Sequence, residues 1–356
     1  MKKSLLNLIC CPKCKKKFVL KILKEDGGET EEGLLTCECG EFFPIVNYIP
    51  RILTGDLRSV LYGQFSDFFL KYKNILPKEE LSTSRTKEAR KKKETAESFA
   101  YEWEMFSSML KEWKNNFDFY FEPVKDINAL KDKTVLEVGC GKGRHTFYVA
   151  DIAKEVVAVD FGRAVDVALA NNKNKNNVHF VQADIYRMPF RESFFAFVFC
   201  IGVLHHLPTP EQGFKKLVSL VKPGGEMLIY VYHSFSKKTF NYYLLKIVNF
   251  FRNITTRLPY KVLHFLCYPI AFLSYIILIL PYKLLFKHMF SKKAWPLAGY
   301  EEYPFQVILN DTFDRFSAPI ENRYSKEQVV NWYNNASLED VNILGGSGWR
   351  IVGKRI

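Results

Sequence analysis

The stretch VLEVGCGKGRHT, residues 135–146, is the part of this sequence that predicts its fold class. A β-rich run ends just before Gly139, and Gly141 and Gly143 follow before a helix pattern begins. Glycines at such a junction allow a tight turn and let the backbone approach a ligand closely. The pattern is G-x-G-x-G, and Arg144 stands where the usual dinucleotide fingerprint has its third glycine. The stretch therefore predicts a strand, a ligand-binding turn and a helix in succession.

Short β-rich runs and helix signals alternate from Thr134 onward. The runs are TVLEV, EVVAVD, VHFVQA, FAFVFC and GEMLIYVY. Strands that alternate with helices form βαβ units, so the sequence predicts an α/β fold with a doubly wound parallel sheet. Asp160 ends the second strand, at about the place where an acidic side chain accepts both ribose hydroxyls of a nucleotide.

Read in order, VLEVGCGKGRHT, VVAVD, VQADIYRMPF, FAFVFCIGVLHHL and LVKPGGEMLIYVY resemble the class I S-adenosylmethionine-dependent methyltransferases. The resemblance extends from about Phe99 to Tyr232 and resumes near the C-terminus. It implies a seven-stranded Rossmann-like sheet and S-adenosyl-L-methionine (SAM) as the cofactor. A nicotinamide-binding or non-catalytic Rossmann domain is the alternative.

The resemblance also implies roles for individual residues. The glycine loop is expected to face the methionine and ribose of SAM, with Glu137 supporting the loop and Asp160 holding the ribose. Asp184 and Ile185 are expected to flank the adenine. The residues expected at the cofactor are Glu137, Gly139, Gly141, Gly143, Asp160, Phe161, Asp184 and Ile185.

Four cysteines gather near the N-terminus of a chain that is otherwise poor in cysteine. Two short knuckles that each offer two thiols can place four sulfurs tetrahedrally around one Zn²⁺, and the metal replaces a core that so short a segment hardly builds. The predicted ligands are Cys11, Cys14, Cys37 and Cys39. Cys10 is a candidate substitute, because only one residue separates the last two ligands. A metal-free remnant is the alternative.

This N-terminal segment resembles the zinc-ribbon adaptor family that accompanies some tRNA methyltransferases. The family pattern runs C-P-x-C, then C-x-x-C-G, then Y/F-P-I and G-I-P. It is matched by CPKC, by residues 43–45 and by Ile49 with Pro50. The sequence departs from the pattern at CEC, and at Tyr48, where the family has glycine.

His205 and His206 follow the fourth predicted strand, at the carboxyl edge where doubly wound folds bind ligands. One imidazole can deprotonate a substrate hydroxyl, or the pair can shape the wall of the acceptor site, which we favour. Position alone suggests that Tyr101, Trp103 and Asp314 also meet the acceptor. The Asn/Asp-Pro-Pro-aromatic motif of amino-group methylases and the Pro-Cys pair of many cytosine-C5 enzymes are absent after this strand. We therefore expect methylation of an oxygen or carbon atom.

Residues 233–300 separate the fifth predicted strand from the last helix and strand pair, and we interpret them as a lid inserted over the substrate. The insertion holds ten Lys or Arg and no Asp or Glu, and its stretch Val262 to Leu280 has no charged residue. About 20 apolar residues span a bilayer, but a single crossing would leave the last strands on the wrong side. A hairpin that dips into one leaflet, bent at Pro269 or Pro281, or helices in the membrane interface satisfy the topology. A hairpin buried against the domain or in a dimer is the alternative.

We expect three parts along the chain: a zinc-ribbon-like domain (1–55), a linker or helical segment (56–97) and a methyltransferase domain (98–356). The run KEARKKKE in the second part is typical of a solvated helix, and ESFAYEWEMFSSMLKEW after it predicts a helix packed on the core. The net charge of +13 favours an anionic partner. We expect a cytoplasmic protein that is peripheral on the membrane face, with membrane contact through residues 239–288.

The leading functional hypothesis is methylation of an amphipathic, membrane-associated small molecule or lipid-linked acceptor. The alternative is RNA methylation, in which the zinc ribbon and KEARKKKE would grip phosphates. A third hypothesis is a non-catalytic adaptor whose Rossmann domain binds the cofactor only for stability.

Overall fold

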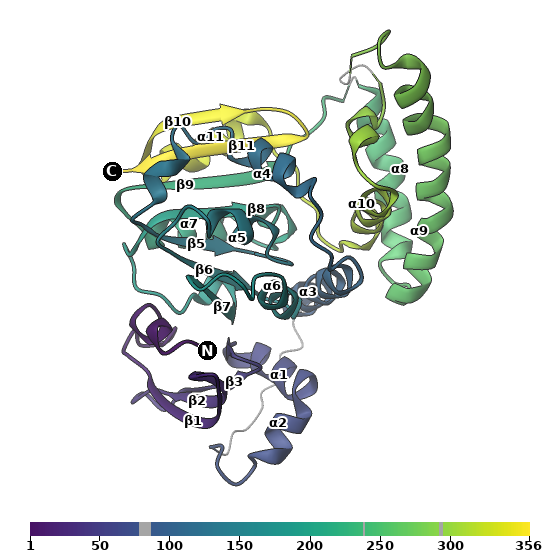
Figure 1. Ribbon diagram of the computed structural model, residues 1–356. Helices are drawn as coiled ribbons and strands as arrows, with labels where there is room; N and C mark the ends of the chain where they lie inside the picture. Colours follow the sequence, from purple (N-terminus) through teal and green to yellow (C-terminus); the bar gives the residue numbers. More distant parts are fainter. Residues whose placement is uncertain (78–86, 238, 292–294) are drawn as a thin grey trace.

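The described strands form one continuous sheet in the computed structural model, and in Figure 1 they follow one another from β10 at the top to the N-terminal strands at the bottom. The structure describes residues 1–77, 87–237, 239–291 and 295–356. Within these ranges the strand order is β1-β2-β3-β4-β7-β6-β5-β8-β9-β11-β10. The strands are β1 Val19–Asp26, β2 Glu29–Thr36, β3 Phe42–Val46, β4 Ile49–Ile52, β5 Thr134–Val138, β6 Glu155–Asp160, β7 Val178–Ala183, β8 Phe195–Ile201, β9 Val221–Tyr232, β10 Leu338–Leu344 and β11 Gly348–Arg355.

The seven strands from β7 to β10 confirm the predicted Rossmann-like sheet. Strands β7, β6, β5, β8 and β9 run parallel, and β11 lies antiparallel between β9 and β10. Their apolar runs are nearly continuous because helices cover both faces of the parallel part. In the register of β5 with β6, Val138 pairs with Val159, so both strands end at the same edge. The turns after them meet at this edge.

Two groups of helices bury the faces of this sheet (Figure 1). On one face α7 and α11 contribute Phe214 and Tyr333 to a core that includes Ile229. On the other face α4, α5 and α6 pack against residues such as Phe199. The helices are α4 Trp113–Phe121, α5 Arg144–Val149, α6 Ala164–Asn171, α7 Pro210–Leu220 and α11 Lys326–Asn335.

The N-terminal strands extend the same sheet. Strand β4 pairs in parallel with β7 through Arg51 with Gln182 and Ile52 with Ala183. The fully buried Arg51 guanidinium also binds both carboxylate oxygens of Asp166 in α6, at 3.0 and 2.5 Å. The expected unit 1–55 therefore shares a core with the strands that follow Thr134, because its Phe43 belongs to the same buried cluster as Val181 of β7.

The segment expected as a linker contains helices α1 (Arg58–Gln64) and α2 (Ser66–Lys71) and the start of α3 (Lys87–Met105). Residues 78–86 of the expected linker lie outside the described residues. The helix expected over ESFAYEWEMFSSMLKEW is not continuous, since α3 ends at Met105 and α4 starts at Trp113. The Lys142 ammonium donates to carbonyl oxygens of residues 106 and 108, at 2.7 and 3.1 Å, and so stabilises the chain where α3 stops.

The insertion after β9 builds a helical layer beside the sheet, drawn in green in Figure 1. Helix α10 lies on the inner side of this layer and α9 on its outer side. The insertion supplies α8 Phe240–Thr255 and α9 Tyr260–Ser274, with π-helical turns at Tyr275–Ile279 and Tyr282–Phe286. Helix α10, Phe305–Ser317, follows the insertion and completes the layer. Residues Lys238, Lys292 and Lys293 of the predicted basic set lie outside the described residues.

Candidate active site and metal centre

A cavity of about 1530 Å³ opens at the carboxyl ends of the parallel strands. The sheet contributes its glycine loop, Asp160 and Asp184, α3 contributes Trp103, and α10 contributes Asp314. Small-molecule sites usually measure roughly 300–1,000 Å³. The cavity therefore has room for a nucleotide-sized cofactor and a second molecule beside it.

The glycine loop has a backbone conformation and close neighbours that disfavour any residue with a side chain. Gly139 has a φ of +77°, and a Cβ atom there would lie 2.1 Å from Cγ2 of Val203. At Gly141 a Cβ atom would lie 2.9 Å from the indole nitrogen of Trp103, which crosses the loop from α3. Gly143 is the N-cap of α5 and does not line the cavity. Two of the three predicted glycines, Gly139 and Gly141, therefore line the cavity and leave room for Val203 and Trp103 beside the loop.

Asp160 holds this loop through both carboxylate oxygens. Gly141 donates its N–H to Oδ2 at 2.9 Å, and Gly162 donates its N–H to Oδ1 at 2.8 Å. Burial raises the pKa of the carboxyl, although these N–H groups act in the opposite direction. Each oxygen retains a lone pair, so the side chain can still accept hydroxyl groups from a ribose.

Asp184, which is predicted to flank the adenine, lies next to α3. Asp184 is buried, caps the turn after β7 by accepting the N–H of Tyr186, and forms an ion pair of 2.5 Å with Lys92. The Lys92 ammonium also lies 5.1 Å from the ring centroid of Phe161 and 4.5 Å from that of Tyr186. Phe161 and Ile185 both line the cavity. Lys92 belongs to KEARKKKE, so one lysine of this run points into the site rather than into solvent.

Glu137 lies behind the loop and accepts a hydrogen bond from the Thr146 hydroxyl. It does not line the cavity, and the role predicted for it, supporting the loop, stays a prediction. Burial raises the pKa of its carboxyl to about 8, with the Thr146 hydroxyl acting against that rise.

This pKa predicts a pH-dependent stability. A carboxyl that stays protonated in the folded state up to about pH 8, against an ordinary pKa of 4.5, stabilises the fold fully below pH 4.5. That contribution is lost as pH rises from there toward 8. The Glu137→Gln chain keeps a neutral side chain, so its melting temperature should fall less than that of the wild type over this range. Equal slopes would show that Glu137 does not titrate there.

The two adjacent histidines occupy different environments. His206 lines the cavity, and its Nδ1 lies 2.6 Å from the carbonyl oxygen of Ile320. A carbonyl only accepts, so Nδ1 carries a proton, and in the neutral ring the lone pair is on Nε2. His205 is fully buried behind it, stacks on Tyr232 at 3.9 Å, and has no partner for either ring nitrogen among the described residues. Burial lowers the pKa of His205 well below its ordinary value, so it is neutral.

Helix α10 and helix α3 place carboxyl groups in the same cavity. Asp314 accepts from the Tyr232 hydroxyl at 3.3 Å, and Asp311 accepts from the Tyr300 hydroxyl at 2.6 Å. The third carboxyl, Glu102, is 1% exposed. Burial, and then the charges of Asp314 and Asp311, raise the pKa of Glu102 well above its ordinary value. Sequence reasoning missed Glu102 and Asp311, since no motif marks either position.

Tyr101 does not take the predicted position at the acceptor. It packs against Tyr260 and Phe313 with ring centroids 5.5 Å from each, and it does not line the main cavity. Trp103 does line that cavity. Successive residues of an α-helix turn by about 100°, so two residues that are two positions apart point to opposite sides. Tyr101 therefore helps to pack the insertion onto α3.

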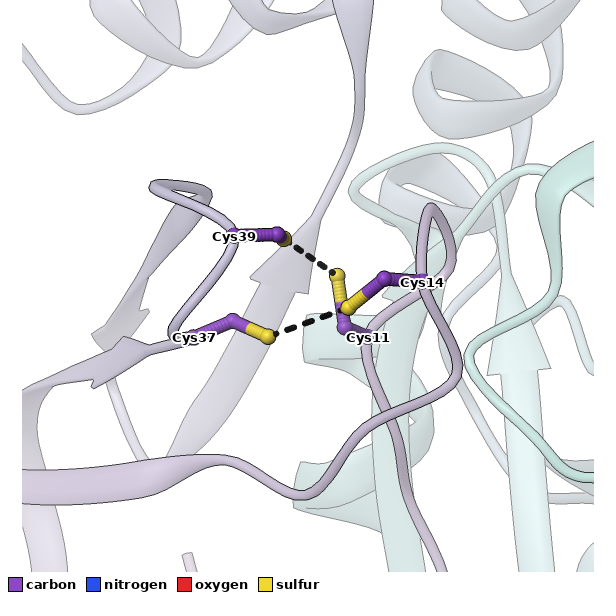
Figure 2. Close-up of side chains that lie close together, drawn as sticks. All are labelled: Cys11, Cys14, Cys37 and Cys39. Atoms are coloured by element: carbon purple, nitrogen blue, oxygen red, sulfur yellow. Dashed lines mark hydrogen bonds between the residues drawn. The ribbon is translucent and has the colours of Figure 1, made fainter.

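The four predicted metal ligands converge in the N-terminal ribbon (Figure 2). Their Sγ atoms all lie within 4.8 Å of one another, with Cys11 and Cys39 separated by 3.6 Å and Cys14 and Cys37 by 3.3 Å. Zinc–sulfur bonds of about 2.3 Å in a tetrahedron require sulfurs about 3.8 Å apart. The donor set and spacing therefore fit a structural Zn²⁺.

The shortened second knuckle closes through a tight turn. Gly40, with a φ of +89°, donates its N–H to the carbonyl of Cys37 at 2.9 Å. This turn brings Cys39 back toward the first knuckle with only one residue between the two ligands. Cys10 is fully buried, donates its N–H to Pro189, and lies outside the sulfur group, so it does not act as the substitute ligand.

We expect about one zinc per purified chain by elemental mass spectrometry. The Cys14→Ser chain should lose this metal and melt at a lower temperature, because zinc binding to such sites contributes several kcal/mol of folding free energy. The Cys10→Ser chain is the control and should retain its zinc. Wild-type chain that is metal-free yet fully stable would contradict this assignment.

Part of the chain that builds this cavity is similar to known proteins. Residues 136–229 match the family model described as a methyltransferase domain. The tRNA U34 carboxymethyltransferase of Campylobacter curvus is 33% identical over 104 residues, which cover 28% of this chain and 35% of the relative. That of Nautilia profundicola is 27% identical over 145 residues, 36% of this chain and 48% of the relative. The chain thus spans less than half of the length of either relative.

A solved structure from Bacillus halodurans C-125, described as a methyltransferase, superposes with a TM-score of 0.40. It is 19% identical, and the superposition covers 65% of this chain and 72% of that one.

Proposed function

We propose that this chain, whose residues 136–229 form a methyltransferase domain, transfers the methyl group of SAM to an oxygen or carbon atom of an amphipathic acceptor. The observation that carries the proposal is that one cavity joins the glycine loop and Asp160 to the wall formed by His206 and α10. Bound SAM supplies a strongly electrophilic methyl group on its sulfonium. The protein has to hold the acceptor in line with that methyl group and exclude water.

His206 is the group that we assign to proton removal from the acceptor. Its Nδ1–H is held by the Ile320 carbonyl, which orients the ring and leaves Nε2 as the proton acceptor. Trp103 and the insertion residue Tyr300 line the same cavity and help to exclude water from it. The sequence favoured a role for both histidines in shaping the wall of the acceptor site. We propose a different role, that of a base, for His206 alone.

The His206→Asn chain should show kcat reduced by about 10²- to 10⁴-fold with KM little changed. Asparagine can place its amide nitrogen near the former Nδ1, so the bond to Ile320 is retained while the basic nitrogen is lost. The measurement is steady-state methyl transfer by the purified chain.

The His205→Asn chain is the matched control, because that ring does not line the cavity. It should change the melting temperature more than it changes kcat. A His206→Asn chain with kcat within about threefold of the wild type would return this histidine to the role of a wall residue.

The composition and position of the insertion, residues 233–300, favour an amphipathic acceptor. The insertion contributes Phe235, Asn241 and Tyr300 to the cavity, so the acceptor would enter beside it. Of the 25 large apolar side chains that are exposed among the described residues, 19 lie between Tyr243 and Phe290. An acceptor with an apolar tail would find a matching surface next to the cavity.

RNA is the second candidate acceptor, and the names of the curated relatives favour it over a lipid. Their similarity covers 28% and 36% of this chain. The basic run gives RNA weaker support, because Arg90 pairs with Glu94 at 2.7 Å and Lys93 with Glu97 at 3.7 Å. Lys92 of the same run is engaged with Asp184.

One experiment separates the two acceptors. SAM with a radiolabelled methyl group is incubated with the purified chain and total cell extract, which is then divided into organic, RNA and aqueous fractions. We expect label in the organic fraction, and none with the Asp160→Ala chain. Label in the RNA fraction would establish the second candidate. Absence of label from all fractions, with SAM bound normally, would contradict methyl transfer.

A further inference from the structure

The outward faces of α8 and of the helix from α9 to Phe286, which we name the lid face, are apolar and open to solvent. On α8 the exposed apolar residues recur at helical spacing along one side. They are Tyr243, Leu244, Ile247, Phe250, Phe251 and Ile254. The inward side binds the domain instead: Arg252 donates to Glu321 at 2.7 Å, and the Thr255 hydroxyl donates to the carbonyl of Phe316 at 2.7 Å.

The second helix repeats this arrangement. Tyr260–Phe286 forms 27 helical residues, long and apolar enough to cross a membrane by composition, with only 22% of its most apolar window buried. A stripe of buried residues packs on Ile308, Leu309 and Phe313 of α10. The stripe consists of Leu263, Cys267, Ala271 and Ile279. Most of the remaining apolar surface is exposed, including Phe265 at 73% and Leu284 at 68%.

Packing excludes a spanning arrangement for this helix. Its buried stripe lies on α10, which carries Asp311 and Asp314 into the cofactor cavity. Moving the helix across a bilayer would either expose that stripe or carry these carboxyl groups to membrane depth. The helix is about 40 Å long at 1.5 Å per residue. Its exposed apolar side therefore favours a position parallel to the surface of a membrane.

Charge identifies the kind of surface that the lid face fits. Exposed Lys246, Arg257, Lys261 and Lys283 lie on or beside its two helices. Residues 233–300 contain no Asp or Glu. Basic groups near an anionic bilayer are worth about 1 kcal/mol each, or about fivefold in the partition coefficient. A purely apolar partner protein would not need this excess of positive charge.

We propose that the lid face docks on a lipid bilayer with anionic headgroups. The apolar side chains enter the acyl boundary, and the lysines contact the headgroups. Docking itself does not depend on methyl transfer. A second consequence rests on the proposed function: residues at the start of the insertion, Phe235 and Asn241, line the cavity, so an acceptor anchored in the membrane could reach it from the docked face.

The test is vesicle flotation of the full chain with phosphatidylcholine alone and with added phosphatidylglycerol. We expect binding that increases with the anionic lipid. The combined Lys246→Glu, Lys261→Glu and Lys283→Glu chain should lose at least about 100-fold in partition coefficient on anionic vesicles. The combined Phe265→Glu and Leu284→Glu chain should lose binding to both kinds of vesicle.

The matched control carries Val19→Glu and Leu70→Glu, which are equally exposed, at 69% and 68%, but lie on the N-terminal ribbon and α2. It should float like the wild type. All variants should bind SAM normally, which shows that the fold is retained and keeps this test separate from turnover. Two outcomes would overturn the proposal: a stable dimer whose lid face is covered by a second copy and ignores vesicles, or a basic surface that binds RNA but no lipid.

Discussion

Replacing Asp160 with alanine should lower the affinity for SAM by at least about 100-fold. The carboxylate orients the glycine loop through the N–H groups of Gly141 and Gly162, and it is positioned to accept ribose hydroxyls. Hydrogen bonds to a charged group contribute about 1.5–3 kcal/mol each, so losing two of them with the ligand costs about 3–6 kcal/mol. Isothermal titration calorimetry of the purified chain measures this loss directly.

The control for this prediction is Asp151→Ala. Asp151 is a surface carboxylate that pairs with Lys175, and its side chain is 60% exposed, away from the residues that line the cavity. It should leave SAM affinity unchanged. An Asp160→Ala chain that binds SAM within about fivefold of the wild type would show that the loop, rather than this carboxylate, supplies the affinity.

Replacing Arg51 with alanine should lower the free energy of unfolding by about 3–5 kcal/mol, the usual cost of removing one partner of a buried ion pair. The guanidinium is fully buried, and it connects the ribbon to α6 through Asp166 and to β7 through Gln182. It also donates to the carbonyl of Val46. Its removal leaves the oxygens of Gln182 and Val46 without this donor, leaves Asp166 with the more distant Arg163 at 3.8 Å, and weakens the short β4–β7 pairing. Urea unfolding followed by circular dichroism measures the effect.

Two further chains test whether geometry or charge is responsible. Arg51→Lys keeps the charge but cannot form the two-point contact with Asp166, so it should recover only part of the stability. Arg90→Ala removes an exposed arginine that pairs with Glu94 and should cost less than about 1 kcal/mol. If Arg51→Ala cost no more than Arg90→Ala, the ribbon would be held on the sheet by apolar packing alone.

Several features could be read from the sequence because each depends on residues that are close together along the chain. Alternating strands and helices, the glycine turn at residues 139–143 and the acid at the end of β6 follow local periodicity and backbone geometry. The four cysteines were recognisable from their spacing, even with a shortened second knuckle. The excess of basic and apolar residues in the insertion was visible as composition alone.

Other features depend on how distant segments pack. Adjacent histidines carry the same local signal, yet only the contact of His206 with Ile320 orients one ring toward the cavity. The choice between Tyr101 and Trp103 depended on which side of α3 faces the loop. Glu102 gained its position in the same way, since α3 and α10 are separated by about two hundred residues and meet only in the folded chain.

The sequence by itself determined the doubly wound sheet, the glycine loop and the group of four cysteines, because periodicity, glycine spacing and thiol spacing are properties of short segments. Only the tertiary structure decided that the ribbon continues the sheet through β4 and β7, and that Lys92 points toward Asp184. It also decided which side of α8 and α9 stays exposed, since α10 and Glu321 cover the other side. These outcomes depend on contacts between segments far apart in the chain, which no local pattern encodes.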